Sequence, residues 1–197
     1  MRIAFRHIVE RGFEGLRVRE VAREAGVNHA TLLYYFPTKE ALIQAVVTQL
    51  AQDFRTPLPG LDDPDTSALE ELRREFADIQ YWVRTTPETF LVLSELTVRS
   101  RRDPAIARIL HALLTGWHEY LVSILHRGIE EGTFRTDLDV DATALVIRTQ
   151  LATIGYQVVA LHNAGDTDRL VHQLAKQTEY WLMASGDSPP IAQGTEA

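Results

Sequence analysis

The sequence contains no cysteine among its 197 residues. Disulfides, cysteine nucleophiles, redox switches and thiolate zinc sites are therefore excluded, and the absence fits a reducing cytoplasm. Long apolar runs are also missing, because the uncharged stretch at residues 149–163 is shorter and more polar than the roughly 20 apolar residues that a membrane span requires. No signal-peptide pattern opens the chain. We therefore expect a soluble cytoplasmic protein that does not bind membranes.

Alternation of apolar and polar residues, the pattern of β-strands, is nearly absent, whereas apolar residues recur three and four positions apart along most of the chain. The pattern predicts an all-α fold of about nine helices. They are expected near residues 2–11, 18–25, 29–35, 39–55, 67–85, 87–101, 104–131, 139–163 and 167–184. The predicted N-cap residues are Thr38, Thr86, Asp103, Asp139 and Asp166, with Pro87 and Pro104 as first helical residues.

Charge is distributed unevenly along the chain. Residues 1–50 hold seven Lys and Arg against five Glu, whereas the remainder holds 13 basic and 22 acidic side chains, which together give the net charge of −7. Nucleic-acid binding depends on a local basic patch and not on the net charge of the whole protein. The proline-rich segment 56–65 is predicted to be a loop between this basic head and an acidic body; its aspartates lack the spacing of a calcium loop. We expect a head at 1–48, a helical body at 49–185 and a flexible tail at 186–197.

The head has the pattern of a helix-turn-helix. Two short predicted helices flank Gly26, which can adopt the positive φ of a tight turn, and Ala22 is small enough to let the helices cross closely. Asn28 is a good N-cap for the second helix, and its amide also suits a phosphate. The predicted inner apolar residues are Val18, Val21, Val27 and Leu32. Such a helix fits the major groove of DNA, although a purely structural helical hairpin has the same pattern.

Residues 12–42, GFEGLRVREVAREAGVNHATLLYYFPTKEAL, resemble the DNA-binding segment of the tetracycline-repressor (TetR) family of bacterial transcriptional regulators. The resemblance is dense over about the first 50 residues, where glycine, apolar, aromatic and Lys-Glu positions are all in register. The rest of the chain resembles the family only in length and helical layout. The resemblance implies a DNA-binding regulator, most often a repressor, whose body dimerises and binds an effector.

The resemblance also implies roles for individual residues. The DNA-contacting set is Arg17, Arg19, Asn28, His29, Ala30, Thr31, Tyr34, Tyr35 and Lys39. Within it, Tyr35 and Lys39 are expected on phosphates, and His29 and Ala30 occupy the variable recognition positions. Leu33 replaces a frequent tyrosine of the family and Ala30 a glycine, and the basic N-terminal arm is short, so no minor-groove contact is expected. The alternative is that Tyr34 and Tyr35 are core aromatics and that Lys39 only begins a helix.

The predicted helix at 139–163 is apolar on two faces. One stripe contains Val140, Ala144, Ile147, Leu151, Ile154, Val158 and Leu161, and the other contains Leu145, Thr149, Ala152, Tyr156 and Val159. One face can pack on its own chain, and the other requires a partner, which the last helix with Leu170, Leu174, Trp181 and Leu182 can join in a four-helix bundle. This predicts a homodimer with Ile154 at its seam, and two recognition helices about 34 Å apart, as an inverted-repeat operator requires. A wholly intramolecular core is the alternative.

Aromatic residues of the body predict an effector pocket. The candidate lining is Trp82, Phe90, Trp117, Tyr120 and Tyr156, and it suits a small apolar or aromatic effector. The same residues can instead be plain core, which would leave an effector-blind DNA-binding protein. An all-helical enzyme that uses His118 and Glu119 is a further alternative, but it lacks a nucleophile, a metal set and a phosphate loop. His111 and His118 are two helical turns apart, too far to share one metal ion. We expect no enzyme, no metal and no cofactor.

Overall fold

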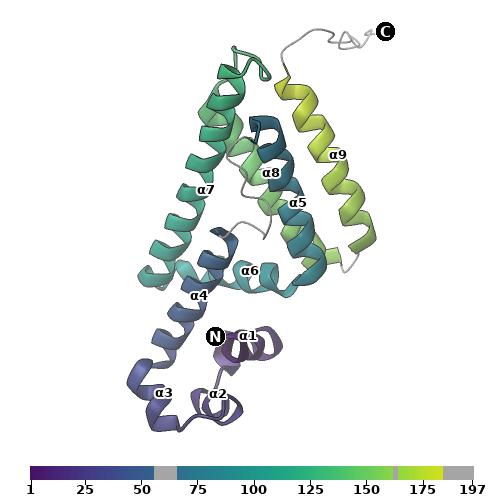
Figure 1. Ribbon diagram of the computed structural model, residues 1–197. Helices are drawn as coiled ribbons and strands as arrows, with labels where there is room; N and C mark the ends of the chain where they lie inside the picture. The colour runs from purple at the N-terminus through teal and green to yellow at the C-terminus, as the bar shows by residue number, and fades with distance from the viewer. Residues whose placement is uncertain (56–65, 162–163, 184–197) are drawn as a thin grey trace, which may run out of the picture.

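The computed structural model describes residues 1–55, 66–161 and 164–183, and these residues form nine α-helices (Figure 1). The helices are α1 (Arg2–Gly15), α2 (Val18–Glu24), α3 (His29–Tyr35), α4 (Lys39–Arg55), α5 (Ala68–Thr85), α6 (Glu88–Ser100), α7 (Pro104–Glu130), α8 (Val140–Leu161) and α9 (Ala164–Leu182). The only β pairing within the described residues is an isolated bridge between Phe134 and Met183. The predicted all-α fold is confirmed. The predicted loop at 56–65 and tail at 186–197 lie outside the described residues.

Three helix starts are capped as the sequence predicts. Thr38 Oγ1 accepts from the backbone N–H of Ala41 at 3.0 Å. Asp139 Oδ1 accepts from Ala142 N–H at 3.0 Å. Asp103 Oδ1 accepts from two backbone N–H groups at 3.0 and 3.3 Å, with Pro104 as the first helical residue. Each carboxylate or hydroxyl satisfies donors that have no partner inside the helix.

The predicted cap at Thr86 is wrong. Thr86 is the C-cap residue of α5, and its hydroxyl is buried with no hydrogen-bond partner among the described residues. Helix α6 begins one residue later than predicted, at Glu88. Sequence inspection missed the cap that does form, a reciprocal capping box in which Ser67 and Glu70 bond each other's backbone N–H. The side chain of Asp166 lies outside the described part of the chain.

The first helix extends beyond its predicted end at residue 11. Gly12 interrupts the helical backbone with φ 66°, and the chain resumes a helical turn as far as Gly15. A positive φ of this kind is strained for any residue with a Cβ atom, so the glycine permits the kink. The turn after Gly12 therefore runs at an angle to the first part of α1, and the kink sets the position of the residues in this turn.

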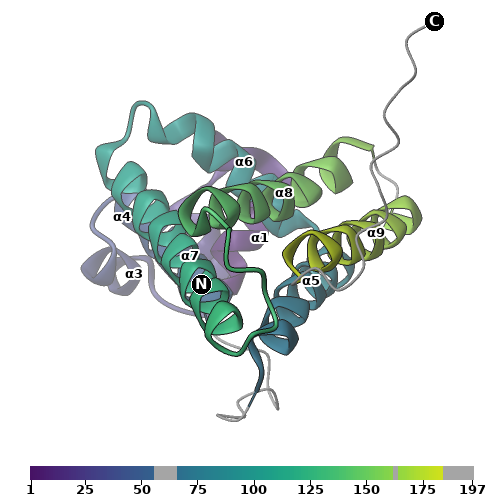
Figure 2. The ribbon, with the colours of Figure 1, turned by 90° about the horizontal axis from the view of Figure 1, so that it is seen from above.

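Two hydrophobic cores organise the molecule. The core of the head joins α1, α2 and α4 and continues into the body through Val92, Leu96 and Ile106 of α6 and α7. The core of the body lies among α5, α6, α7, α8 and α9. Viewed from above, α6 crosses the end of the body beside α1 (Figure 2). The head is thus packed against the body through α4 and α6.

Ion pairs attach α9 to α5. Arg73 bonds Glu179 at 2.7 Å, and Arg84 pairs with Asp168, whose carboxyl pKa is lowered by hydrogen bonds from Arg84 and then from Gln80. These contacts use one side of α9. None of the helices in the described ranges is long and apolar enough to cross a membrane.

The two stripes of α8 have different environments. Ala144, Ile147, Leu151 and Ile154 are buried within the chain, and Ile154 is only 1% exposed. The prediction that Ile154 lies at a dimer seam is therefore wrong, because its own chain already covers it. The second stripe is open at Leu145 and Thr149. The side chains of Tyr156, Val158, Val159 and Leu161 lie outside the described residues.

Candidate nucleic-acid interface and effector region

The helix-turn-helix of the head has the predicted turn. Gly26 adopts φ 68°, and an added Cβ would meet no atom within 4 Å, so the backbone conformation and not space requires glycine here. The turn is closed by a hydrogen bond of 3.0 Å from Val27 N–H to Ala22 O. Val21 and Ala22 are buried, but Val27 is exposed, and its predicted place on the inner face is wrong. Asn28 caps α3 as predicted, with Oδ1 accepting from Ala30 N–H at 2.8 Å.

The third helix lies at the edge of the head core, against which the half-buried Leu32 packs. All seven residues of α3 are described, and none is buried. Tyr34 and Tyr35 are 81% and 68% exposed, with ring centroids 5.3 Å apart in an edge-to-face arrangement. They are not core aromatics of this chain. Large exposed aromatic residues on a short helix are typical of a binding surface.

The predicted contact residues gather at this end of the molecule. Asn28, Ala30 and Thr31 are exposed, and His29 is half-buried. Helices α2 and α3 lie together at the end of the head that faces away from the body (Figure 1). The helix itself carries no acidic residue, so nothing on it repels a phosphate.

Arg17, Arg19 and Lys39 lie on the elements that flank α3. Arg17 precedes α2, Arg19 is exposed in its first turn, and Lys39 begins α4. Arg17 Nη1 and Lys39 Nζ both donate to the carbonyl oxygen of Glu14, at 2.9 and 3.0 Å. Sequence inspection missed Glu14, and the only signal for it is the pair of glycines, Gly12 and Gly15, that surround it.

Acidic side chains of α2 are directed to α1. Glu20 pairs with Arg11, and the hydrogen bond from this guanidinium lowers the pKa of the Glu20 carboxyl. Glu24 pairs with Arg6, and its Oε2 lies 2.8 Å from Nε2 of the buried His7. The negative charge of α2 is thus partly neutralised by α1, which favours a positive potential near α3.

Two of the predicted pocket residues, Trp82 and Phe90, form an aromatic cluster with Phe54 of α4. The Phe54 ring centroid is 5.0 Å from that of Trp82 and 6.3 Å from that of Phe90. Phe90 is buried against Gly155, where a Cβ atom would approach its ring to 1.9 Å. Phe54 was missed because it follows the predicted head. The cluster connects the end of α4 to α5, α6 and α8.

The other aromatic candidates have acidic neighbours. Trp117 Nε1 donates to Glu75 Oε2 at 2.6 Å, and burial raises the pKa of Glu75 to about 7 against the opposing effect of this hydrogen bond. Burial also raises the pKa of Asp78, whose Oδ1 has no partner among the described residues. Tyr120 is partly exposed, and burial together with nearby Glu75 raises its pKa to about 12. The side chain of Tyr156 lies outside the described residues.

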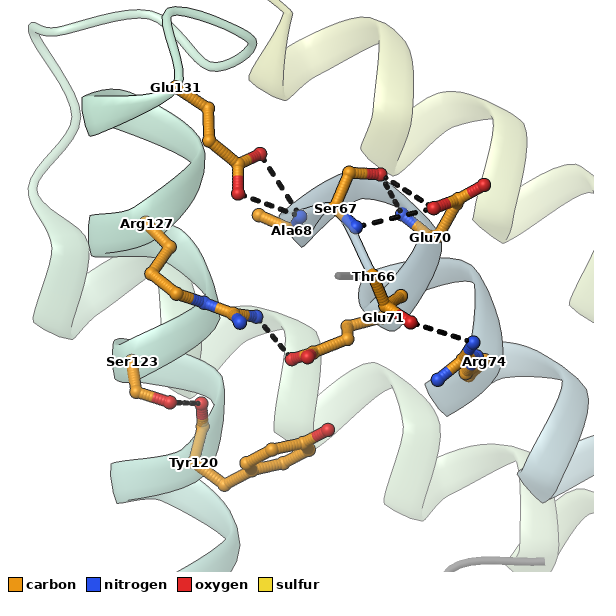
Figure 3. Close-up of polar contacts among 10 residues, drawn as sticks. All are labelled: Thr66, Ser67, Ala68, Glu70, Glu71, Arg74, Tyr120, Ser123, Arg127 and Glu131. Atoms are coloured by element: carbon orange, nitrogen blue, oxygen red, sulfur yellow. Dashed lines mark hydrogen bonds and ion pairs between the residues drawn. The ribbon is translucent and has the colours of Figure 1, made fainter. Parts of the chain in front are cut away.

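Figure 3 shows the upper part of this region, where α5 begins beside α7. Arg127 reaches across to Glu71, and Glu131 accepts from Ala68 N–H at 3.1 Å. Glu71, Glu75 and Asp78 follow each other at steps of four and three along α5, and therefore share one face. This spacing signals an acidic face on α5, which a search for aromatic residues alone does not find.

The outer surface of α8 and α9 carries shallow grooves. Their lining includes Val146, Gln150, Leu170, Leu174 and Trp181. Val146, Leu170 and Trp181 are exposed in the single chain, as is Leu145 nearby. The structure thus leaves an apolar strip on the two helices that the sequence assigns to dimerisation.

The histidine candidates do not converge. His118 Nε2 lies 2.8 Å from Asp141 Oδ1, whereas His111 and Glu119 are exposed. Among the described residues, no group of three His, Asp or Glu side chains could hold a metal ion.

Comparison with known proteins gives matches to two family models. Residues 1–46 match the model described as bacterial regulatory proteins, tetR family, and residues 68–179 match the C-terminal domain of BetI-type transcriptional repressors. The regulator RutR of Escherichia coli K12 is 49% identical over 65 residues, which are 32% of this chain and 31% of RutR. The match thus spans about a third of the length of RutR. The repressor KstR2 of Mycobacterium tuberculosis H37Rv is 25% identical over 148 residues, 75% of this chain and 74% of KstR2.

Solved structures share the whole fold. A TetR regulator from Haloarcula marismortui superimposes with a TM-score of 0.82 at 20% identity, covering 93% of this chain and 95% of that one. A transcriptional regulator from Saccharomonospora viridis, solved in complex with choline, has a TM-score of 0.80 at 23% identity with the same coverage. The second family model alone spans more than half of the sequence, and the chain therefore belongs to the TetR family of bacterial transcriptional regulators.

Proposed function

We propose that this protein is a DNA-binding transcriptional repressor, which occupies an inverted-repeat operator as a homodimer and leaves it when a small effector binds. The observation that carries the proposal is α3, a capped helix with no buried residue among its seven and two exposed tyrosines. Residues 1–48 bind DNA, and residues 49–185 dimerise and bind the effector. We place this action in the cytoplasm, where the DNA of a bacterial cell is found.

In this proposal α3 enters the major groove, where His29 and Ala30 face base edges. Asn28, Thr31, Tyr34 and Tyr35 contact phosphates or base edges. Arg17, Arg19 and Lys39 flank the helix and contact the backbone. Phosphate contacts position the protein without reading sequence, whereas contacts in the groove discriminate between bases.

The homodimer forms through α8 and α9, with Leu145, Val146 and Trp181 on its interface. These side chains are exposed in the single chain, and exposed apolar strips of this kind are favourable to cover. A two-fold axis through this strip repeats α3 on the partner. A separation of about 34 Å between the two copies matches successive major grooves on one side of the duplex.

The effector site lies at the aromatic residues of the body. Trp82, Phe90, Trp117, Tyr120 and Tyr156 suit an apolar or aromatic effector. Glu75, whose described hydrogen-bond partner is an indole, additionally favours an effector with a cationic or hydrogen-bond-donating group. The choline complex of the Saccharomonospora viridis regulator is consistent with this chemistry. An effector that favours the DNA-free form by about 2.7 kcal/mol lowers operator affinity about a hundredfold.

Selection of random duplex DNA by the purified protein tests the function directly. We expect an enriched inverted repeat whose half-sites are about one helical turn apart. Recovery of no sequence, and no binding to any duplex at low ionic strength, would refute the proposal. An effector-blind protein would bind the same repeat, but choline and aromatic amines would neither raise its melting temperature nor release the DNA.

A further inference from the structure

The short turn that follows the kink at Gly12 carries Glu14 to the boundary between head and body. Its side chain is 90% exposed. Its carbonyl oxygen accepts the hydrogen bonds from Arg17 and Lys39 described above. A carbonyl at a helix end carries partial negative charge, and this attracts both cations. The backbone of Glu14 therefore locates two of the residues proposed to bind phosphate.

The carboxylate of Glu14 lies between two cations that belong to different regions. Arg99 Nη1, in the last turn of α6, is 3.2 Å from Oε1. Lys39 Nζ, at the start of α4, is 3.8 Å from Oε2. The Arg99 guanidinium also lies over the Phe13 ring, with Cζ 5.5 Å from its centroid. Figures 1 and 2 show α6 and α1 side by side, so that the body reaches this position directly.

The Glu14 carboxylate and a DNA phosphate compete for the ammonium group of Lys39. The negative charge of the Glu14 carboxylate repels a phosphate that approaches Lys39. A Lys39 ammonium already neutralised by this carboxylate also releases no counterion from DNA when it meets a phosphate. The shorter contact to Arg99 draws the carboxylate toward the body. Without Arg99, the remaining ion-pair partner of the Glu14 carboxylate within the described residues is Lys39.

We propose that Arg99 is a positioning residue for the DNA interface, which competes with Lys39 for the Glu14 carboxylate, limits the Lys39 contact to the longer 3.8 Å pair and so leaves more of the lysine charge to a phosphate. The inference rests on the proposed DNA-binding function. Because α6 also carries Phe90 of the aromatic cluster, a displacement of α6 would release Glu14 onto Lys39. The body would then weaken DNA binding by charge alone.

The experiment measures affinity for the selected duplex at several salt concentrations. The variants are R99A, E14Q, the double variant R99A/E14Q, and R101A as the control. Arg101 is exposed at the end of α6, so R101A removes the same charge from the same region. We expect R99A to bind about tenfold more weakly, with a salt slope smaller by about one for each protomer. E14Q should restore both quantities in the R99A background, and R101A should change neither.

The recovery of DNA affinity in R99A/E14Q distinguishes the proposed role of Arg99 from a purely structural one. If Arg99 acted only by packing on Phe13, removal of the Glu14 charge would not restore affinity. Equal affinities of R99A and R101A, or a defect of R99A that persists in R99A/E14Q, would overturn the inference. If R99A does not fold, Arg99→Gln with and without E14Q gives the same test, with the same expected restoration. A wild-type protein that binds no duplex would instead refute the proposed function itself.

Discussion

The third helix of the head and the centre of the body differ in where they place aromatic and acidic side chains. The head exposes Tyr34 and Tyr35 and pairs the carboxylates of α2 with arginines of α1. The body buries Phe76 and Phe90 and leaves Glu75 with an indole as its described hydrogen-bond donor. Exposed aromatics on a small capped helix fit an external partner. A carboxylate that stays among aromatic side chains despite the cost of its desolvation fits a ligand that binds inside the body.

The largest expected effect concerns the exposed apolar strip of the body. Val146→Glu would bury two like charges at the proposed two-fold axis, a cost of about 3 kcal/mol or more, so we expect monomers by light scattering at micromolar concentration. Leu114→Glu is the matched control, because Leu114 is 42% exposed and Val146 is 44% exposed. An unchanged mass for Val146→Glu, or equal dissociation of the control, would show that the strip is not the interface.

The exposed surface of the head is tested by the double variant Thr31→Ala/Tyr35→Ala. Two contacts are lost in each protomer, at about 1 kcal/mol or more each, so operator affinity should fall at least about a hundredfold. Both side chains are exposed, so the melting temperature and the dimer mass should stay the same. A gel-shift titration measures the affinity. Wild-type binding by the double variant would remove α3 from the interface.

The buried carboxylate of the body predicts a pH dependence of stability. The pKa of Glu75 is raised to about 7 from its ordinary value of 4.5, so the folded state binds more protons than the unfolded state between these values, and stability from this group falls as pH rises through the window. Glu75→Gln removes this fall in stability, because glutamine does not ionise. We expect the variant to be more stable than wild type by about 1–3 kcal/mol at pH 8, with a smaller difference at pH 5.

Urea unfolding at several pH values measures this difference. Glu119→Gln is the control, since Glu119 is an exposed acid on α7 and should follow the wild-type curve. Parallel curves for wild type and Glu75→Gln would contradict the raised pKa.

The smallest effect compares two hydroxyl residues near the ends of α5. Ser67→Ala removes the capping box and should cost about 1 kcal/mol of stability. Thr86→Val replaces a buried hydroxyl that has no described partner and should be neutral or slightly stabilising. The difference in melting temperature between the two variants measures the contrast. Equal destabilisation would mean that Thr86 has a partner after all.

The sequence predicted much of the head and less of the body. The turn at Gly26 and the cap at Asn28 were predictable because each depends on residues within a few positions. Val27 was misplaced, since apolar character does not say which side a turn residue faces. In the body, Glu75 escaped notice because its importance comes from Trp117, 42 residues away in the chain.

The sequence by itself determined the helices and four of their caps, because periodicity and capping are local interactions. The four caps are Asn28, Thr38, Asp103 and Asp139. Only the tertiary structure decided which stripe of α8 lies inside, and it buried Ile154 while leaving Val146 exposed. It also placed Arg99 of the body beside Glu14 of the head. Such pairings depend on how helices cross, and the relative free energies of alternative crossings are set by side chains far apart in the chain.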